Sequence, residues 1–361
     1  MSRPLQAFID SAALRRNLHR ARELAPGCRV MAVIKSDGYG HGLLRVAEAL
    51  RAADGFGIVR VEDAAAIRDS GYDGQILLLE GMYGADELGE IARVGAVVVL
   101  HHEEQLRMLE RSPLHAPIRV WLKFDTGMHR IGFRPAEAAR LIDRLTRLPG
   151  VHLDGAMSHL ASADDPSDPS TAEQIACFAS IELPPGCSRS LANSAGLVAW
   201  PDSRLDWVRP GIMLYGSSPL TGVAATVQGL APVMRLRSQL IAVRPLKSGE
   251  AVGYGEAFRC PEDMMIGVVA CGYGDGYPRH VPCGTPVWVD GRRVPLVGKV
   301  SMGMLSVDLR AAPQAGVGAP VELWGGHVHV DEIAAAAGTV SYELMCRVSA
   351  SVPRVEGTGG D

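Results

Sequence analysis

Short apolar stretches alternate with amphipathic ones through the first two-thirds of this 361-residue chain, at a spacing of roughly 20 to 25 residues. Eight stretches have the length and composition of strands: 31–35, 56–60, 75–80, 96–100, 118–124, 151–158, 189–193 and 205–215. Helices are predicted over 12–24, 42–53, 61–69 and 135–148. Because eight βα units favour a closed barrel over an open sheet, we predict an α/β fold built on a (β/α)8 TIM-type barrel. Chemistry in such barrels lies at the carboxyl ends of the strands.

The last third of the chain differs, beginning near residue 221. Helix patterns become rare, and the alternating stretches 285–290 and 293–297 face each other across Asp290-Gly291, which predicts a hairpin. We therefore expect a barrel domain over residues 1–225 and a mostly β domain over residues 226–361. One late helix is predicted over 330–337, and the tail 356–361 is expected to be disordered.

Composition excludes several classes of function. A net charge of -4 without a basic cluster argues against a nucleic-acid surface and favours a small-molecule partner. Seven cysteines without C-x-x-C spacing suit neither a disulfide framework nor a zinc site, so reduced thiols in a cytoplasmic protein are expected. No apolar run approaches the roughly 20 residues that span a bilayer, and no signal peptide is recognisable. The adjacent His101 and His102 are interpreted as a solvated loop and not as a metal site.

One strand delivers a lysine to its carboxyl end. Lys35 follows the apolar run 31–34 and is itself followed by Gly38, Gly40 and Gly42. Glycines let the backbone approach a ligand closely and leave amide groups free to bind it. The combination suggests a cofactor site, although a surface lysine before an ordinary turn would give the same local pattern.

Other polar residues fall where the barrel prediction places strand ends. They are Lys123, Asp125, Arg130, Ser158, His159, Asn193, Ser194, Gly196, Arg209, Gly211 and Ile212. Convergence of these groups on one mouth indicates a site for a phosphate-bearing, electrophilic cofactor. A lysine able to form a Schiff base is the expected partner of pyridoxal phosphate.

The chain also resembles a known family. The matching segments are 32–42, 125–133, 192–195, 208–216, 253–255, 272–279 and 297–302. Each segment is weakly specific, but their co-occurrence in this order is highly specific. The chain is similar to the alanine racemases, the pyridoxal-phosphate-dependent family with a barrel and a β domain, and the resemblance covers nearly its whole length.

The resemblance implies a two-base racemase, homodimeric and cytoplasmic, that interconverts L- and D-alanine for peptidoglycan synthesis or alanine catabolism. Lys35 would hold the cofactor and act on the D-substrate side, and Tyr254, from the β domain, on the L-substrate side. Two bases on opposite faces let a proton leave one face and return on the other.

The resemblance also assigns the surrounding residues. The residues matching its phosphate-binding positions are Tyr39, Ser194, Gly211 and Ile212. Arg130 and Met302 match positions that contact the substrate carboxylate, and Lys123 matches a lysine that is often carbamylated. Arg209 would face the pyridine nitrogen and keep it unprotonated, since arginine does not readily release a proton. His159 would pack on the cofactor ring and continue a hydrogen-bond chain to Arg209.

Two departures leave substrate specificity open. Gly303 stands where the family commonly has aspartate, and Ala350 replaces a common tyrosine at the mouth. Three alternatives follow: a broader amino-acid racemase, a decarboxylase of similar architecture, and a carrier that binds pyridoxal phosphate without turnover. Arg209 argues against the decarboxylase, which would place an acid there, and Tyr254 with its β domain argues against the carrier.

Overall fold

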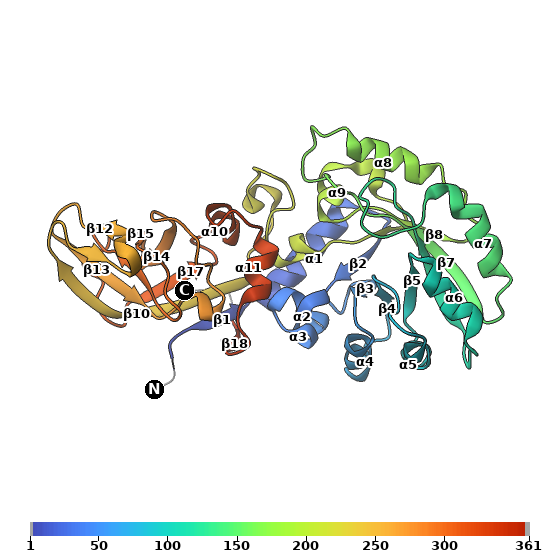
Figure 1. Ribbon diagram of the computed structural model, residues 1–361, viewed down its shortest axis with the longest axis horizontal. Helices are drawn as coiled ribbons and strands as arrows, with labels where there is room; N and C mark the ends of the chain where they lie inside the picture. Colours follow the sequence, from blue (N-terminus) through green and yellow to red (C-terminus); the bar gives the residue numbers. More distant parts are fainter. Residues whose placement is uncertain (1–2, 358–361) are drawn as a thin grey trace.

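The computed structural model describes residues 3–357. Figure 1 shows a barrel at one end of an elongated molecule and a mostly β body at the other. Helices α10 (Val330–Ala336) and α11 (Ser341–Arg347) lie between the two bodies. The predicted fold class is confirmed, and the late helix is found as α10, whereas α11 was not predicted.

Eight parallel strands close the barrel, and β2 pairs with β9 to complete it. The strands are β2 (Arg29–Val33), β3 (Gly55–Ile58), β4 (Gln75–Leu78), β5 (Val97–Leu100), β6 (Ile118–Lys123), β7 (Val151–Met157), β8 (Ser188–Ser190) and β9 (Trp207–Val208). Strand β9 is much shorter than the predicted 205–215. Pro210 has no N–H to donate to a ladder, and residues Ile212–Tyr215 form the helical turn η4. The barrel interior is filled by a cluster that includes Met31, Trp121 and Trp207.

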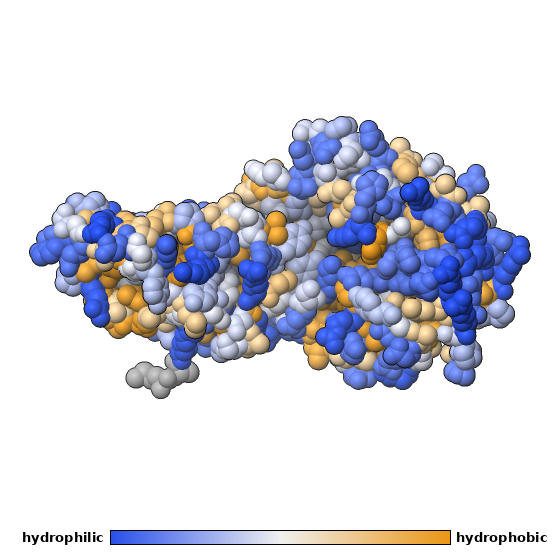
Figure 2. All heavy atoms as spheres, viewed as in Figure 1, coloured by the Kyte–Doolittle hydropathy of each residue, from blue (hydrophilic) through white to orange (hydrophobic). Residues whose placement is uncertain are grey.

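Helices surround the barrel: α1 (Ser11–Leu24), α3 (Leu43–Ala49), α4 (Val61–Asp69), α5 (Leu88–Val94), α6 (Glu103–Arg111), α7 (Ala138–Thr146), α8 (Ser170–Ala179) and α9 (Ser194–Ala199). Helix α1 begins after Asp10, whose carboxylate accepts a 2.8 Å hydrogen bond from the amide of Ala13. Apolar faces pack inward, and hydrophilic side chains cover much of the outer surface over α6 and α7 (Figure 2). Ion pairs such as Arg144 with Glu103 and Glu110 join these two helices.

The second body is an eight-stranded sheet in the order β13-β16-β15-β14-β17-β10-β1-β18. Its strands from the last third are β10 (Met234–Leu246), β13 (Met264–Val269), β14 (Pro286–Val289), β15 (Arg292–Val297), β16 (Leu305–Asp308), β17 (Pro320–Trp324) and β18 (Arg354–Glu356). Strands β14 and β15 form the predicted hairpin around Asp290-Gly291. A separate pair, β11 (Ala251–Val252) and β12 (Phe258–Arg259), flanks the sheet.

The first strand of the chain belongs to this second sheet. Strand β1 (Gln6–Ile9) lies between β10, with which it is antiparallel, and β18, with which it is parallel. The chain therefore crosses from one body to the other before the barrel begins, while the predicted division at residue 225 stays a prediction. Residues 358–361 of the expected tail lie outside the described residues, but Glu356 ends β18 and is ordered against Ile9.

Within residues 3–357, no helix is long and apolar enough to cross a membrane. All seven cysteines lie in this range and none is paired with another.

Candidate active site

A cavity of about 1450 Å³ opens at the carboxyl ends of the barrel strands and extends to α10 and α11. Ten of the predicted site residues line it: Lys35, Tyr39, Lys123, Arg130, His159, Asn193, Ser194, Arg209, Gly211 and Ile212. They come from segments that lie far apart in the sequence and follow five different strands. The barrel thus brings these ten residues to one mouth, whereas Asp125, Ser158, Gly196, Tyr254 and Met302 lie outside that lining.

Lys35 begins a turn of unusual handedness. Residues 36–39 have φ between 53° and 59° and ψ between 40° and 53°, which is the left-handed helical region. Three of the four, Ser36, Asp37 and Tyr39, are not glycine. A left-handed conformation costs about 1–2 kcal/mol for each such residue, so the turn stores several kcal/mol that other contacts must offset.

Three groups of contacts hold the turn. The buried ring of His41 lies with Nδ1 2.9 Å from the carbonyl oxygen of Tyr39 and 3.0 Å from that of Gly38. The Asp37 carboxylate accepts a 2.7 Å hydrogen bond from the amide of Leu43. A side chain at Gly40 would lie 2.3 Å from the carbonyl oxygen of Met345, so α11 packs directly on the backbone here. Burial lowers the pKa of His41 to about 4, so the ring is neutral and Nδ1–H is available to donate.

Cations crowd the barrel mouth. Lys123 ends β6 and is 5% exposed. Burial, reinforced by the neighbouring charges of Arg209, Arg130 and Lys35, lowers the pKa of Lys123 to about 7. A large fraction of this amine is therefore unprotonated at neutral pH, which makes it a nucleophile.

Arg209 follows β9 and is 3% exposed. It donates to the carbonyl oxygens of Ser158 at 2.6 Å and Leu191 at 3.2 Å, and to Ser190 Oγ at 2.5 Å. Burial lowers the pKa of Arg209 to about 9, which still leaves it charged at neutral pH. Burial and the adjacent Arg209 charge hold the pKa of His159 well below its usual range. The Arg209 charge acts on His159, but Arg209 donates its hydrogen bonds to Ser158, Ser190 and Leu191.

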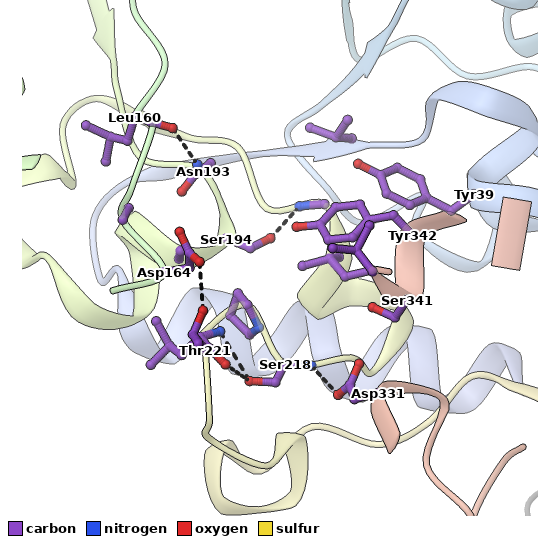
Figure 3. Close-up of a pocket in the computed structure, with 18 of the residues that line it drawn as sticks. Tyr39, Leu160, Asp164, Asn193, Ser194, Ser218, Thr221, Asp331, Ser341 and Tyr342 are labelled. Atoms are coloured by element: carbon purple, nitrogen blue, oxygen red, sulfur yellow. Dashed lines mark hydrogen bonds between the residues drawn. The ribbon is translucent and has the colours of Figure 1, made fainter. Parts of the chain in front are cut away.

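One wall of the cavity is built from hydroxyl groups and backbone. Ser194 Oγ accepts hydrogen bonds from the amides of Gly211 at 2.8 Å and Met213 at 3.4 Å, which leaves its proton free to donate into the cavity. A side chain at Gly211 would lie 2.6 Å from Tyr39 Oη. Figure 3 shows the Tyr342 hydroxyl group directed toward Ser194, with the Tyr39 ring beside that of Tyr342. Burial raises the pKa of Tyr39, so this hydroxyl is a donor at neutral pH.

Sequence reasoning missed several groups at the site. Tyr342, on α11, lies with its ring centroid 5.9 Å from that of Tyr39. No motif marks it, because its place depends on α11 packing against the Lys35 turn. Thr221 Oγ1 donates to Asp164 at 2.8 Å across the cavity rim (Figure 3). The interpretation of His101 as part of a solvated loop is wrong: its half-buried ring lines the cavity and contacts the carbonyl oxygen of Glu80 at 2.9 Å.

The second predicted base lies elsewhere. Tyr254 is 66% exposed, in a turn between β11 and β12, and Met302 is 65% exposed. Strand β12 lies at the end of the molecule distant from the barrel (Figure 1). One chain therefore presents Lys35 in a cavity and Tyr254 on an outer surface of the other body.

Comparison with known proteins identifies relatives over nearly the whole chain. The model described as alanine racemase, N-terminal domain, matches residues 9–219, and that of the C-terminal domain matches residues 233–356. An alanine racemase of Nitrosococcus oceani is 50% identical over 97% of this chain and 98% of its own length. The crystal structure of the biosynthetic alanine racemase of Pseudomonas aeruginosa has a TM-score of 0.95 at 44% identity, covering 99% of this chain and all of the other. That of Acinetobacter baumannii has a TM-score of 0.92 at 35% identity, covering 99% and 100%.

Proposed function

The chain belongs to the alanine racemase family, an isomerase acting on amino acids, and we propose that it uses pyridoxal phosphate with Lys35 and Tyr254 as its two bases. The observation that carries the proposal is the position of Lys35. Its amine lies in one cavity with Lys123, Arg130 and Arg209, beside a wall of hydroxyl groups and backbone amides.

The residues present fit pyridoxal phosphate. The Ser194 hydroxyl proton and the Tyr39 hydroxyl are available donors, and no side chain could be added at Gly211 without striking Tyr39. These groups suit a phosphate dianion. The Ile212 amide, at the start of η4, has no hydrogen-bond acceptor among residues 3–357 and can also bind the phosphate.

The protein's own task in the reaction is to move a proton between faces. When bound, pyridoxal phosphate acidifies the α-hydrogen of an amino acid by accepting the electron pair left behind. The Lys35 amine takes or returns the proton on the D-substrate side, and the Tyr254 hydroxyl does so on the L-substrate side. Bases fixed on opposite faces avoid any need to turn the substrate over.

Four residues orient the substrate and tune the site. The Arg130 guanidinium and the backbone amide of Met302 would hold the substrate carboxylate. Carbamylation of Lys123, which requires its unprotonated amine, would place a negative partner beside Arg130. The lowered pKa of Lys123 supports this modification. Arg209, locked by its hydrogen bonds, would face the pyridine nitrogen and deny it a proton.

We further propose that the working unit is a homodimer with sites shared between chains. The exposed Tyr254 and Met302 have no role in the cavity of their own chain. A cavity of about 1450 Å³ is also larger than the usual upper range of about 1,000 Å³ for ligand sites, which leaves room for a neighbour's side chains. A twofold dimer would insert each β body into the partner's mouth.

The proposal includes a cytoplasmic location, which the unpaired cysteines favour, and a role in supplying D-alanine for peptidoglycan or in alanine catabolism.

The first test of the proposed function is polarimetry of the purified protein with L-alanine, where loss of optical rotation is expected. Borohydride reduction followed by peptide mapping should then place the cofactor label on Lys35. Label on Lys123 or Lys299 would contradict the assignment.

Substrate breadth needs its own measurement. The small side chains at Gly303 and Ala350 favour tolerance at the mouth, so rates on alanine, serine and lysine should be compared. A rate on serine or lysine equal to that on alanine would identify a broader racemase.

A further inference from the structure

Arg3 joins two segments of the second body. Its guanidinium forms a bidentate ion pair with Asp275, with Nη2 2.7 Å from Oδ2. The same Nη2 donates to the carbonyl oxygen of Gly303 at 2.7 Å. A side chain at Gly303 would lie 3.2 Å from this Nη2, so the guanidinium docks where position 303 has no side chain.

The two segments that Arg3 joins are packed backbone to backbone. The amide of Tyr273 donates to the carbonyl oxygen of Ser301 at 3.0 Å, and that of Gly274 donates to Met302 at 2.8 Å. A side chain at Gly272 would lie 2.2 Å from the Ser301 carbonyl oxygen, so nothing separates the two. The position of Met302 is therefore set by the turn of residues 272–276.

Asp275 is the fixed point of that turn. It is 3% exposed and accepts a 2.9 Å hydrogen bond from the amide of Gly272. Its carbonyl oxygen accepts from the amide of Ser349, beyond α11, at 3.0 Å. A carboxylate buried this deeply needs a charged partner, since an unpaired one is strongly unfavourable.

We propose that Arg3 is a positioning residue for the reaction, which acts by holding Asp275 and Gly303 together and so aligning Met302 for the partner's active site. The inference rests on the proposed function, because it assumes that Met302 serves the neighbouring chain. Arg3 itself does not touch the substrate. It fixes the register between the turn 272–276 and the loop 301–304, and removing it frees both to shift.

The test compares Arg3→Ala and Arg3→Lys with Arg16→Ala in the full-length enzyme. Arg16 is the matched control: it pairs with the buried carboxylate of Asp10 at 3.3 Å, but on α1. Arg3→Ala should raise KM for alanine on the order of tenfold, as expected for misplaced binding groups. Bound cofactor absorbance should not change, because the Lys35 side is untouched. The KM of Arg3→Lys should lie between those of the wild type and Arg3→Ala, since one ammonium cannot reproduce the planar bidentate contact.

Hydrogen exchange supplies a readout that does not depend on turnover. In Arg3→Ala the amides of Tyr273 and Gly274 should lose protection, while in Arg16→Ala they should keep it. A folded Arg3→Ala with wild-type KM and exchange, or an equal effect from Arg16→Ala, overturns the inference. If Arg3→Ala does not fold, an Arg3→Lys variant identical to wild type in both readouts overturns it. A wild-type protein that fails to racemise alanine would refute the proposed function instead, and the exchange arm would still decide whether Arg3 holds the two segments together.

Discussion

Mixing two inactive variants provides a quantitative test of the shared site. Lys35→Ala removes the base in the cavity, and Tyr254→Phe removes only the hydroxyl group of a side chain that is 66% exposed on the other body. A positioned general base contributes about 10²–10⁴-fold to rate, so each homodimer should retain at most about 1% of wild-type activity.

The expected recovery follows from the geometry. If Lys35 and Tyr254 of one site come from different chains, a mixed dimer has one site with both defects and one site with neither. Random refolding makes about half of the dimers mixed, and one good site in two gives about a quarter of wild-type activity. That is a rise of about 25-fold or more over the parent variants.

The assay is racemisation of L-alanine after the two variants are unfolded together and refolded with cofactor, with mixed dimers quantified by distinct affinity tags. A matched control mixes wild type with the double variant carrying both substitutions. Shared sites then leave only wild-type homodimers active, about a quarter of the total, whereas sites within one chain leave about half. No recovery in the first mixture despite proven mixed dimers, or half activity in the control, would refute the reasoning.

Three further expectations concern single groups. Removing dissolved CO2 and bicarbonate should lower alanine turnover in the wild type but not in Lys123→Ala. The reason is that a pKa of about 7 leaves about half of the Lys123 amine unprotonated at pH 7, against roughly one part in 2,500 for an ordinary lysine. ¹³C NMR with labelled bicarbonate should show the carbamate, and its absence contradicts the proposal. Arg209→Glu should slow racemisation and raise transamination of alanine to pyruvate, measured with lactate dehydrogenase. Arg209→Lys should change the ratio of transamination to racemisation less. Unchanged racemisation without pyruvate in Arg209→Glu would show that Arg209 does not tune the cofactor. Burial opposes protonation of His329, but the contacts of its ring with Asp331 and with the Gly216 carbonyl oxygen raise its pKa. The stability that protonated His329 contributes is therefore present at lower pH and is lost as the pH rises through this raised pKa. Urea unfolding from about pH 6 to pH 8.5 should therefore show a fall in stability that His329→Gln removes, and equal slopes for both proteins would contradict this.

The local sequence pattern was sufficient to predict those elements whose pattern of apolar residues is set by their own burial. The apolar runs of the barrel strands, the helix 61–69 and the hairpin at Asp290-Gly291 each follow from periodicity and turn chemistry within one segment. The strand ends then carried the predicted site residues to one mouth, because the barrel geometry fixes where such ends lie.

Other features depend on partners far along the chain. Strand β1 has four residues, and its place is set by β10 and β18, which the local sequence does not reveal. The left-handed turn after Lys35 is held by His41, by the Asp37 side chain and by α11 near Met345, so Ser-Asp-Gly-Tyr permits the turn without requiring it. Tyr342 reaches the cavity for the same reason, since α11 carries it there.

The place of β1, next to the edge of the second sheet, bears on the order in which the protein folds. Among the described residues, β18 pairs with β1 alone, so the edge of this sheet forms only when Arg354–Glu356 reach residues 7–9, which lie more than 340 positions earlier in the chain. The barrel strands between them can close while synthesis continues, because domains tend to form in the order in which they leave the ribosome. A truncated product would then carry a formed barrel beside an unfinished edge of the second sheet. Pairing of β18 with β1, and not closure of the barrel, then completes this edge of the second sheet.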